Sequence, residues 1–200
     1  MGNLRSVQKA FEKVDSDAII TNDHNTIKNA DKIVLPGVGS FKDGMKQLEE
    51  LKLIELLNDE IITKQKPFLG ICLGMQLLAT KSYENGETQG LDWVDAKIIK
   101  FDFSKFDNKL KIPHVGWNNI LFKNKNSLFN NIEDNSDFYF VHSYHFNTSE
   151  DIVSSTTDYG LDFVSSIQKD NLYAFQFHPE KSQTVGLKII ENFVNLKGDS

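Results

Sequence analysis

The feature that most constrains this 200-residue chain is a cysteine between two glycines, where an apolar segment meets a helical pattern. Residues 67–71 begin with a proline, are apolar and end in glycine-rich sequence, which predicts a short buried strand. Residues 74–79 are expected to begin a helix. Gly70-x-Cys72-x-Gly74 therefore has the form of a nucleophile elbow, a tight strand-to-helix turn that needs small flanking residues. The alternative is a structural cysteine in the core, and this stretch alone does not separate the two.

A second stretch supplies the groups that a thiol nucleophile needs. Residues 172–177 predict another apolar strand, which runs directly into His178-Pro179-Glu180. A nucleophilic cysteine needs a base, and the base needs a third group to fix its tautomer. Spacing of two residues in an extended segment places His178 and Glu180 on the same side. The two stretches together favour a Cys72–His178–Glu180 triad over unrelated core and surface residues.

These stretches resemble the class I (triad) glutamine amidotransferases. The resemblance is carried by residues 70–76 and 177–180, and it extends from the first residues to the final helix. Within that family, residues 35–41, 113–118 and 139–144 resemble one branch, the glutaminase subunits of imidazole glycerol phosphate synthase. The resemblance implies a flavodoxin-like α/β fold, glutamine hydrolysis to glutamate and ammonia, and transfer of that ammonia to a (β/α)8-barrel cyclase in a heterodimer. The partner would then make imidazole glycerol phosphate and aminoimidazole carboxamide ribotide.

The expected site residues follow from chemistry and from the resemblance. Amides of Leu73 and of Val38 or Gly39 are the candidate oxyanion donors, because Leu73 follows the nucleophile and 36–39 is glycine-rich. Gln76 lies one helical turn beyond Cys72 and can reach a substrate. The resemblance alone adds further residues. It implies Glu84, Ser143 and Tyr144 as glutamine contacts, and Asn3, Tyr139 and Lys181 at the partner interface.

Composition fits one domain over residues 1–200 and excludes several classes. Hydrophobic content of 40% and charged content of 25% are typical of globular proteins. A net charge of −6 disfavours nucleic acid, and a single cysteine forbids an internal disulfide. With that one cysteine and no histidine spacing suited to a ligand set, we expect no metal and no cofactor. The sequence shows no membrane-spanning run and no signal peptide, so we expect a cytoplasmic protein.

The remaining pattern predicts an α/β fold with a doubly wound, mainly parallel first half and a mixed or antiparallel second half. A first helix is expected around Val7, Ala10, Phe11 and Val14, capped by Asn3 or Ser6. Strands are expected at 17–21 and 31–35, a helical turn around residues 27–30, a helical stretch at 41–63 broken near Lys52, and a loop at 81–90. Later strands are expected at 94–103, 120–123, 138–146, 152–156 and 163–169, and a last helix at 184–196.

The start of the chain carries one further expectation. In the resembled family, a buried apolar strand precedes the residues that match Gly2-Asn3. The sequence suggests that this first strand is missing and that Met1 is an internal methionine of a longer reading. Buried backbone N–H and C=O groups that lacked their hydrogen-bond partners in this strand would each cost roughly 1 to 3 kcal/mol of stability.

Three alternatives to the histidine-pathway interpretation are considered. An amidotransferase of the same branch could supply ammonia to nucleotide-sugar or surface-glycan synthesis with identical catalytic residues. A cysteine peptidase or deglycase on a related fold is disfavoured by Gln76 and the Pro36-Gly37 loop. A catalytically silent scaffold is disfavoured by the intact Cys72, His178 and Glu180.

Overall fold

The computed structural model describes residues 4–104 and 110–196. Its helices are α1 (Leu4–Glu12), α2 (His24–Asn29), α3 (Phe41–Glu50), α4 (Leu53–Leu57), the π-helix η1 (Asn58–Thr63), α5 (Leu73–Gln76), the 3-10 helices η2 (Ser127–Phe129) and η3 (Pro179–Lys181), and α6 (Gln183–Val194). Its strands are β1 (Ile33–Gly37), β2 (Phe68–Cys72), β3 (Ala79–Ser82), β4 (Thr88–Gln89), β5 (Val94–Lys100), β6 (His114–Asn119), β7 (Leu121–Phe122), β8 (Asp137–His142), β9 (Tyr144–Thr148), β10 (Val153–Asp158), β11 (Asp162–Lys169) and β12 (Leu172–Phe175).

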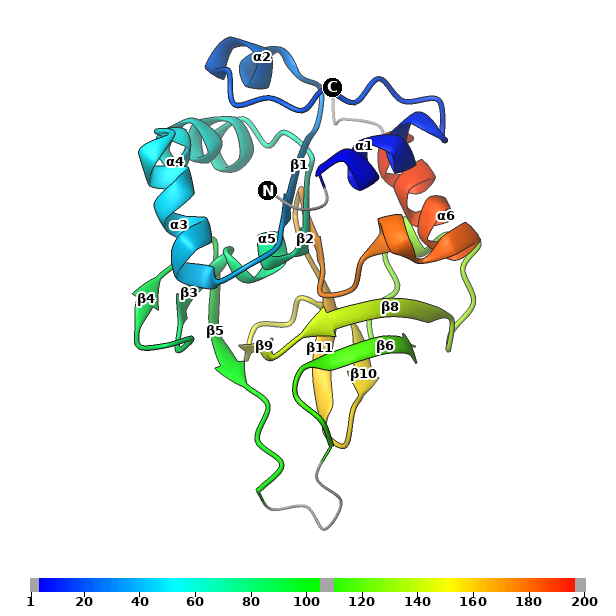
Figure 1. The fold of residues 1–200 in the computed structure, drawn as a ribbon. Coiled ribbons are helices and arrows are strands. Elements are labelled where there is room, and N and C mark those ends of the chain that lie inside the picture. Colours follow the sequence, from blue (N-terminus) through cyan, green and yellow to red (C-terminus); the bar gives the residue numbers. More distant parts are fainter. Residues whose placement is uncertain (1–3, 105–109, 197–200) are drawn as a thin grey trace.

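A mixed sheet forms the centre of the fold (Figure 1). Its main path runs β1-β2-β12-β11-β9-β5-β3-β4, with β10 and β7 joined to β11. β2 pairs in parallel with β1 and with β12, so the carboxyl ends of these three strands meet at one edge. β3 and β5 are also parallel, whereas β11, β9 and β10 pair antiparallel with their neighbours. The predicted α/β class and the antiparallel second half are both confirmed.

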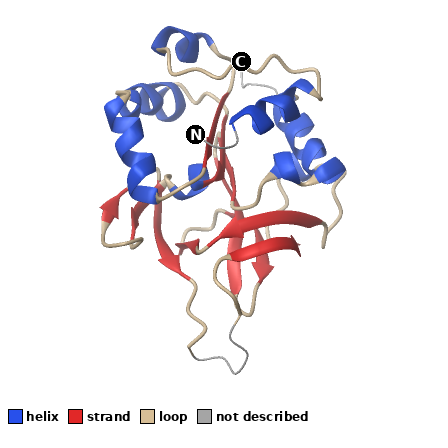
Figure 2. Ribbon diagram, viewed as in Figure 1, coloured by secondary structure: helices blue, strands red, loops and turns tan. Residues whose placement is uncertain are grey.

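Helices cover both faces of the parallel strands (Figure 2). Strand residues alternate between two cores because successive side chains of a strand point to opposite faces. Phe68 joins the core under α3, α4 and η1, whereas Leu69 and Ile71 join the core under α1 and α6. Phe193 on α6 is 1% exposed and packs edge-on against Phe11 of α1. The predicted first and last helices are therefore confirmed. Val7, Ala10 and Phe11 are buried as expected, whereas Val14 lies beyond the end of α1 and is half-buried.

A separate two-stranded antiparallel sheet, β6 with β8, lies beside the carboxyl end of the central sheet. Its inner side carries Phe138, which stacks on Phe177 just after β12, and Phe140, which packs edge-on against the same ring. The backbone amide of His178 donates to the carbonyl of Tyr139 at 2.9 Å. These contacts fix the second sheet against the residues that follow β12.

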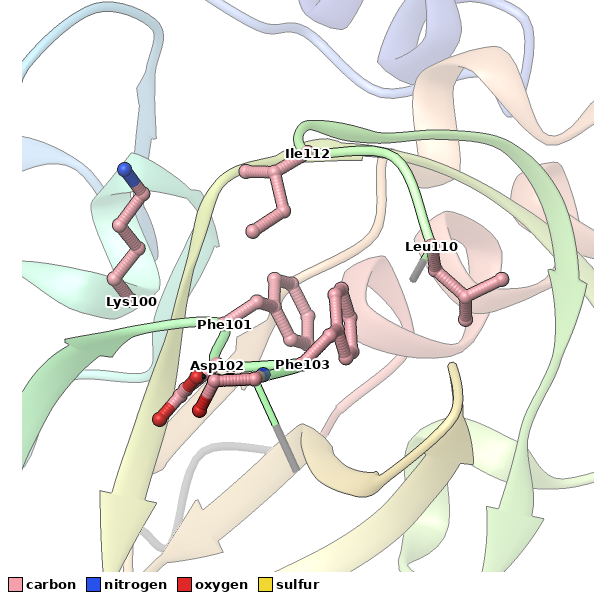
Figure 3. A pocket seen from close by; sticks show the side chains of 7 residues that line it. Lys100, Phe101, Asp102, Phe103, Leu110 and Ile112 are labelled. Carbon is pink, nitrogen blue, oxygen red and sulfur yellow. Dashed lines mark hydrogen bonds between the residues drawn. The ribbon is translucent and has the colours of Figure 1, made fainter. Parts of the chain in front are cut away.

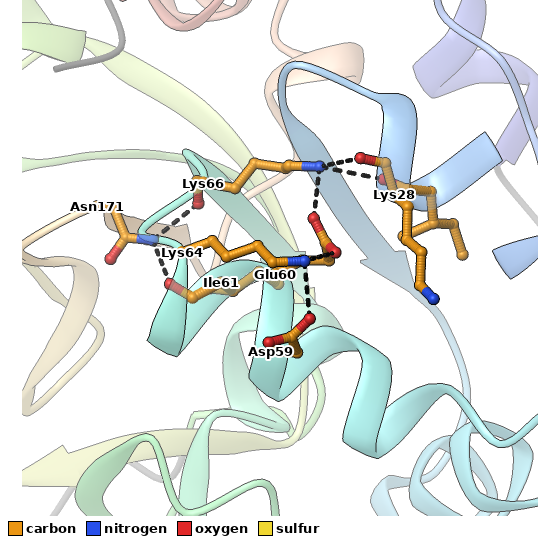
Figure 4. Close-up of polar contacts among 8 residues, drawn as sticks. Lys28, Asp59, Glu60, Ile61, Lys64, Lys66 and Asn171 are labelled. Atoms are coloured by element: carbon orange, nitrogen blue, oxygen red, sulfur yellow. Dashed lines mark hydrogen bonds and ion pairs between the residues drawn. The ribbon is translucent and has the colours of Figure 1, made fainter. Parts of the chain in front are cut away.

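At the opposite end of the parallel strands, one buried carboxylate ties three segments together (Figure 4). Glu60 in η1 is 1% exposed and accepts from Lys64 at 2.7 Å and from Lys66 at 2.8 Å. The Lys66 ammonium also donates to the carbonyls of Ile27 and Lys28 in α2. Because both lysines also hold its pKa below the usual carboxyl range, Glu60 is a charged, paired anchor for the start of β2, the strand that ends at Cys72.

The N-terminal third departs from the sequence-based expectations. Residues 17–21 form no strand, and Ile19 and Ile20 are 66% and 44% exposed. β1 is half-buried along its length, instead of fully buried as expected, because β2 is its one strand partner among the described residues. Ser6 lies inside α1 and does not cap it, and Asn3 lies outside the described residues. The break near Lys52 is confirmed, since Lys52 has φ of 55° between α3 and α4.

Other differences come from strand pairing that the local sequence does not reveal. The helix after Cys72 is one turn long and ends at Gln76, and Ala79 already begins β3. Residues 81–90, expected as a loop, contain the end of β3 and its partner β4. The expected strand at 138–146 divides at Ser143 into β8 and β9, which belong to different sheets. β6 was not predicted as a strand.

No helix within residues 4–104 and 110–196 has the length and apolar character needed to cross a membrane.

Candidate active site

The tight strand-to-helix turn predicted around Cys72 is present. Cys72 ends β2 with φ of 54° and ψ of −109°, an unusual conformation for a residue with a Cβ. A Cβ on Gly70 would lie 3.0 Å from backbone atoms of Gly74. A Cβ on Gly74 would lie 1.7 Å from the carbonyl oxygen of Leu35 in β1. Both glycines are therefore required by close backbone contact, and the turn places the sulfur at the carboxyl edge of the sheet.

His178 and Glu180 form the expected hydrogen-bonded pair. His178 Nδ1 lies 2.8 Å from Glu180 Oε1, and both side chains are almost fully buried. Burial lowers the pKa of His178, but the nearby Cys72 thiol and Glu180 carboxylate raise it more, to about 9. At neutral pH the ring is therefore an imidazolium. Its Nε2 is buried and makes no close hydrogen bond within residues 4–104 and 110–196, although Cys72 lies near enough to raise the pKa of the ring.

The sulfur of Cys72 has two further polar neighbours that the sequence did not single out. The side-chain amide of Gln176 donates toward Sγ at 3.7 Å, and the carbonyl oxygen of Val141 lies 3.9 Å from Sγ. Gln176 is fully buried. One signal could have identified it: Gln176 is the single polar residue in the apolar run 172–177, two residues before His178.

The residues expected to form the oxyanion site adjoin Cys72. Strand pairing sets Gly37 opposite Cys72, so Val38 and Gly39 begin beside the sulfur. Gly39 has φ of 107°, which favours glycine. Leu73 is the first residue of α5, and a Cβ on Gly37 would lie 2.9 Å from its Cβ.

Of the residues expected to bind glutamine, Gln76 lies within the site, whereas Glu84 contacts the start of α3. Gln76 lies within the site and donates to the carbonyl of Tyr144 at 3.0 Å and to Oε1 of Gln176 at 2.9 Å. Ser143 and Tyr144 lie at the junction of β8 and β9, directly after the strand that carries Val141. Glu84 instead accepts from the backbone amide of Phe41 at 2.6 Å, at the start of α3. In this structure it holds the helix that follows the 38–40 loop.

The expected interface residues lie on the second sheet and on η3. The ring of Tyr139 contacts Trp117 edge-on at 6.0 Å, and the ammonium of Lys181 lies 5.5 Å from the Tyr139 ring centroid. Trp117 and Val115 on β6 are 48% and 54% exposed. An apolar surface therefore lies one strand away from His178 and Val141.

Among residues 4–104 and 110–196, no group of three or more His, Cys, Asp or Glu side chains is arranged to hold a metal ion.

A sequence model of the glutamine amidotransferase class-I family matches residues 2–196. The chain belongs to the class I glutamine amidotransferase family. It is 48% identical over 195 residues to the "Imidazole glycerol phosphate synthase subunit HisH 1" of Campylobacter jejuni strain RM1221, covering 98% of this chain and 96% of that protein. It is 50% identical to the imidazole glycerol phosphate synthase subunit HisH of Aquifex aeolicus, over 96% of this chain and 91% of that protein.

Solved structures show the same fold at low identity. PurLQS from Thermotoga maritima is similar with a TM-score of 0.69 and 15% identity, over 97% of this chain and 92% of that chain. The glutaminase domain of CTPS from Trypanosoma brucei is similar with a TM-score of 0.64 and 18% identity, over 98% of this chain and 90% of that chain. This glutamine amidotransferase therefore has the fold of its family, and its detailed chemistry is argued from its own residues.

Proposed function

We propose that this glutamine amidotransferase is the glutaminase subunit of an imidazole glycerol phosphate synthase. The observation that carries the glutaminase assignment is the paired His178 and Glu180 beside Cys72 on a nucleophile elbow. The relatives named HisH support the synthase assignment, since they match nearly the whole chain at about half identity.

The proposed reaction is amide hydrolysis through a thioester. An imidazolium beside the sulfur favours the thiolate, which attacks the side-chain amide carbon of glutamine. His178 then gives its Nε2 proton to the departing ammonia, and its Nδ1 stays hydrogen-bonded to Glu180. Water, activated by the now neutral His178, hydrolyses the thioester and releases glutamate.

Binding and charge stabilisation are assigned to groups already beside the sulfur. The tetrahedral oxyanion would accept from the amide of Leu73 and from the amide of Val38 or Gly39, and removing one such donor typically costs about 3 kcal/mol. Gln76, Ser143 and Tyr144 would contact glutamine, and Glu84 would act through the 38–41 segment.

The proposed partner is a (β/α)8-barrel cyclase that receives ammonia in a cytoplasmic heterodimer. Three exposed apolar side chains support a protein interface close to the site: Val38 beside the nucleophile, and Val115 and Trp117 on β6. Tyr139 and Lys181 would complete it, because Tyr139 also binds the backbone of His178. Exposed apolar side chains gathered around a site mark protein interfaces.

The deciding experiment uses the complex with the barrel partner and two nitrogen sources. Cys72→Ala should abolish glutamine hydrolysis and glutamine-dependent synthesis, yet keep synthesis from added ammonium salt, because the two reactions take place on different chains. An equal loss of ammonia-dependent turnover would contradict this division. Replacing the cyclase substrate with nucleotide-sugar acceptors would identify the alternative pathway.

A second arm compares the isolated chain with the complex. We expect poor glutamine hydrolysis alone and activation when the partner binds its nucleotide ligand, since Gly37 and Gly39 permit the loop amides to take more than one orientation. A fully active isolated chain would remove the argument for such a switch.

A further inference from the structure

We infer that His142 is a positioning residue for the nucleophile, acting through a continuous series of hydrogen bonds that ends on the sulfur of Cys72. The inference rests on the proposed glutaminase function and extends it to groups outside the triad. It concerns the side chains of β6 and β8 that the triad does not use.

The outer part of the series is a pair of histidines locked in one tautomer each. His142 Nδ1 lies 2.8 Å from the carbonyl oxygen of Tyr144, which can only accept, so Nδ1 carries the hydrogen. In the neutral ring Nε2 then accepts, and it lies 3.1 Å from Nδ1 of His114. His114 must therefore donate from Nδ1, which leaves its Nε2 to face the Asn118 amide at 3.4 Å.

Burial keeps both rings neutral. His142 and His114 are 6% and 3% exposed. Burial lowers the pKa of His142 to about 3 and that of His114 to about 4. Neutral rings are the state that the hydrogen-bond directions require, so the geometry and the electrostatics agree.

Aromatic packing holds the pair in place. The ring of Phe101 lies 5.2 Å from His142, and Figure 3 shows Phe101 beside Phe103 at the edge of a surface pocket that Ile112 and Leu110 also line. Tyr159 stacks on His114 at 3.9 Å. The rings therefore have little freedom to rotate away from Tyr144.

The inner part of the series fixes two glutamine amides. Gln76 uses both hydrogens of Nε2, one toward the Tyr144 carbonyl and one toward Gln176 Oε1. Gln176 therefore turns its own Nε2 hydrogens toward Cys72 Sγ. A donor at that position stabilises a thiolate. If the Tyr144 carbonyl lost its donor from His142, the orientation of both amides would be less restricted.

The test compares two polar substitutions of similar size at one position. In His142→Asn, the side-chain amide can occupy the place of Nδ1 and still donate to Tyr144. In His142→Gln, the longer side chain places its amide where Nε2 stands, so the Tyr144 carbonyl loses its donor. The readouts are kcat for glutamine hydrolysis in the complex, and the rate at which iodoacetamide alkylates Cys72, the one cysteine of the chain.

We expect His142→Asn to stay within about threefold of wild type in both rates, and His142→Gln to fall roughly tenfold in both. A merely structural role predicts the opposite change in alkylation, because loosening the fold exposes a buried thiol and speeds its modification. Equal rates for the two variants, or faster alkylation of His142→Gln, would overturn the inference.

His145→Gln is the matched control. His145 is 7% exposed and packs on Phe101 at 4.8 Å, but it takes no part in the series. In this control, kcat for glutamine hydrolysis and the rate of Cys72 alkylation should both stay within twofold of the wild-type values. If His142→Gln does not fold, Gln176→Met tests the end of the series that contacts Cys72. We expect Cys72 in this variant to be alkylated tenfold more slowly. Alkylation at the wild-type rate would overturn the inference. The alkylation comparison decides this even if the chain hydrolyses no glutamine.

Discussion

Gly74 and the carbonyl oxygen of Leu35 lie so close that a Cβ on the glycine would approach the oxygen to 1.7 Å. This contact sets α5 directly on β1, and it places the start of the helix next to the loop that follows Gly37. The turn at Cys72 is therefore held by backbone contact from a neighbouring strand and not only by its own residues.

Gly74→Ala should destabilise the protein by more than about 3 kcal/mol, because a fixed backbone oxygen occupies the space of the new methyl group. Gly70→Ala should cost less, since its nearest atoms would lie at 3.0 Å. Urea unfolding measures both. Lys46→Ala on the exposed face of α3 is the control and should change the unfolding free energy by less than about 0.5 kcal/mol. A Gly74→Ala protein of wild-type stability would show that the turn can relax.

Glutaminase activity should decline above pH 9. In the proposed mechanism His178 must be protonated to deliver a proton to ammonia, and its pKa is about 9. In Glu180→Gln the hydrogen bond can persist but the negative charge is lost, so the alkaline midpoint of kcat/KM should fall by about one unit. This variant should also keep more activity than His178→Asn. An unchanged midpoint would mean that another group sets the alkaline limb.

Stability should decline on the acid side for a different reason. The pKa of His142 in the folded protein, about 3, lies below its ordinary value of 6.5. The neutral, buried ring therefore stabilises the fold fully above pH 6.5, and this stabilisation is lost as the pH falls toward 3. At pH 4 the loss is about 3 kcal/mol for this ring. The unfolding free energy of His142→Asn should therefore depend less on pH between 7 and 4. Parallel pH profiles for wild type and His142→Asn would contradict this account.

Trp117→Ala should weaken binding of the proposed barrel partner by about 2 kcal/mol, or roughly thirtyfold in Kd, because an exposed tryptophan in the proposed interface would carry much of the affinity. Calorimetric titration measures it. Alkylation of Cys72 in the isolated chain should not change. Ile62→Ala is the control, since Ile62 is an exposed apolar side chain at 41% in η1, which directly follows α4, and Figure 1 shows α4 well apart from β6. Equal binding by Trp117→Ala and wild type would place the interface elsewhere.

The residues that sequence predicted well are those whose role depends on their neighbours in the chain. The glycines around Cys72 and the pair His178–Glu180 are local patterns, and each has a steric or hydrogen-bonding reason visible in a few residues. The final helix was predicted for the same reason, because its buried residues recur at helical spacing.

The features that sequence missed depend on pairing between distant residues. β6 became apparent only from its register with β8, where His114 stands opposite His142. Gln176 resembled a strand residue until its amide was found beside Cys72. Residues 17–21 have a strand-like composition, but no strand lies beside them in the described residues to accept their hydrogen bonds.

Within residues 4–104 and 110–196, β1 lies at the edge of the sheet, and this position has a consequence for contacts between two molecules of that shape. The amide of Ile33 donates toward β2 through the carbonyl of Pro67, so by strand alternation Val34 and Pro36 face the open side. Proline has no N–H, which leaves Val34 as the one outward backbone donor of β1. A second molecule approaching this edge would find too few donors to extend the sheet. Pro36 thus protects a half-exposed apolar strand against aggregation without disturbing its pairing with β2.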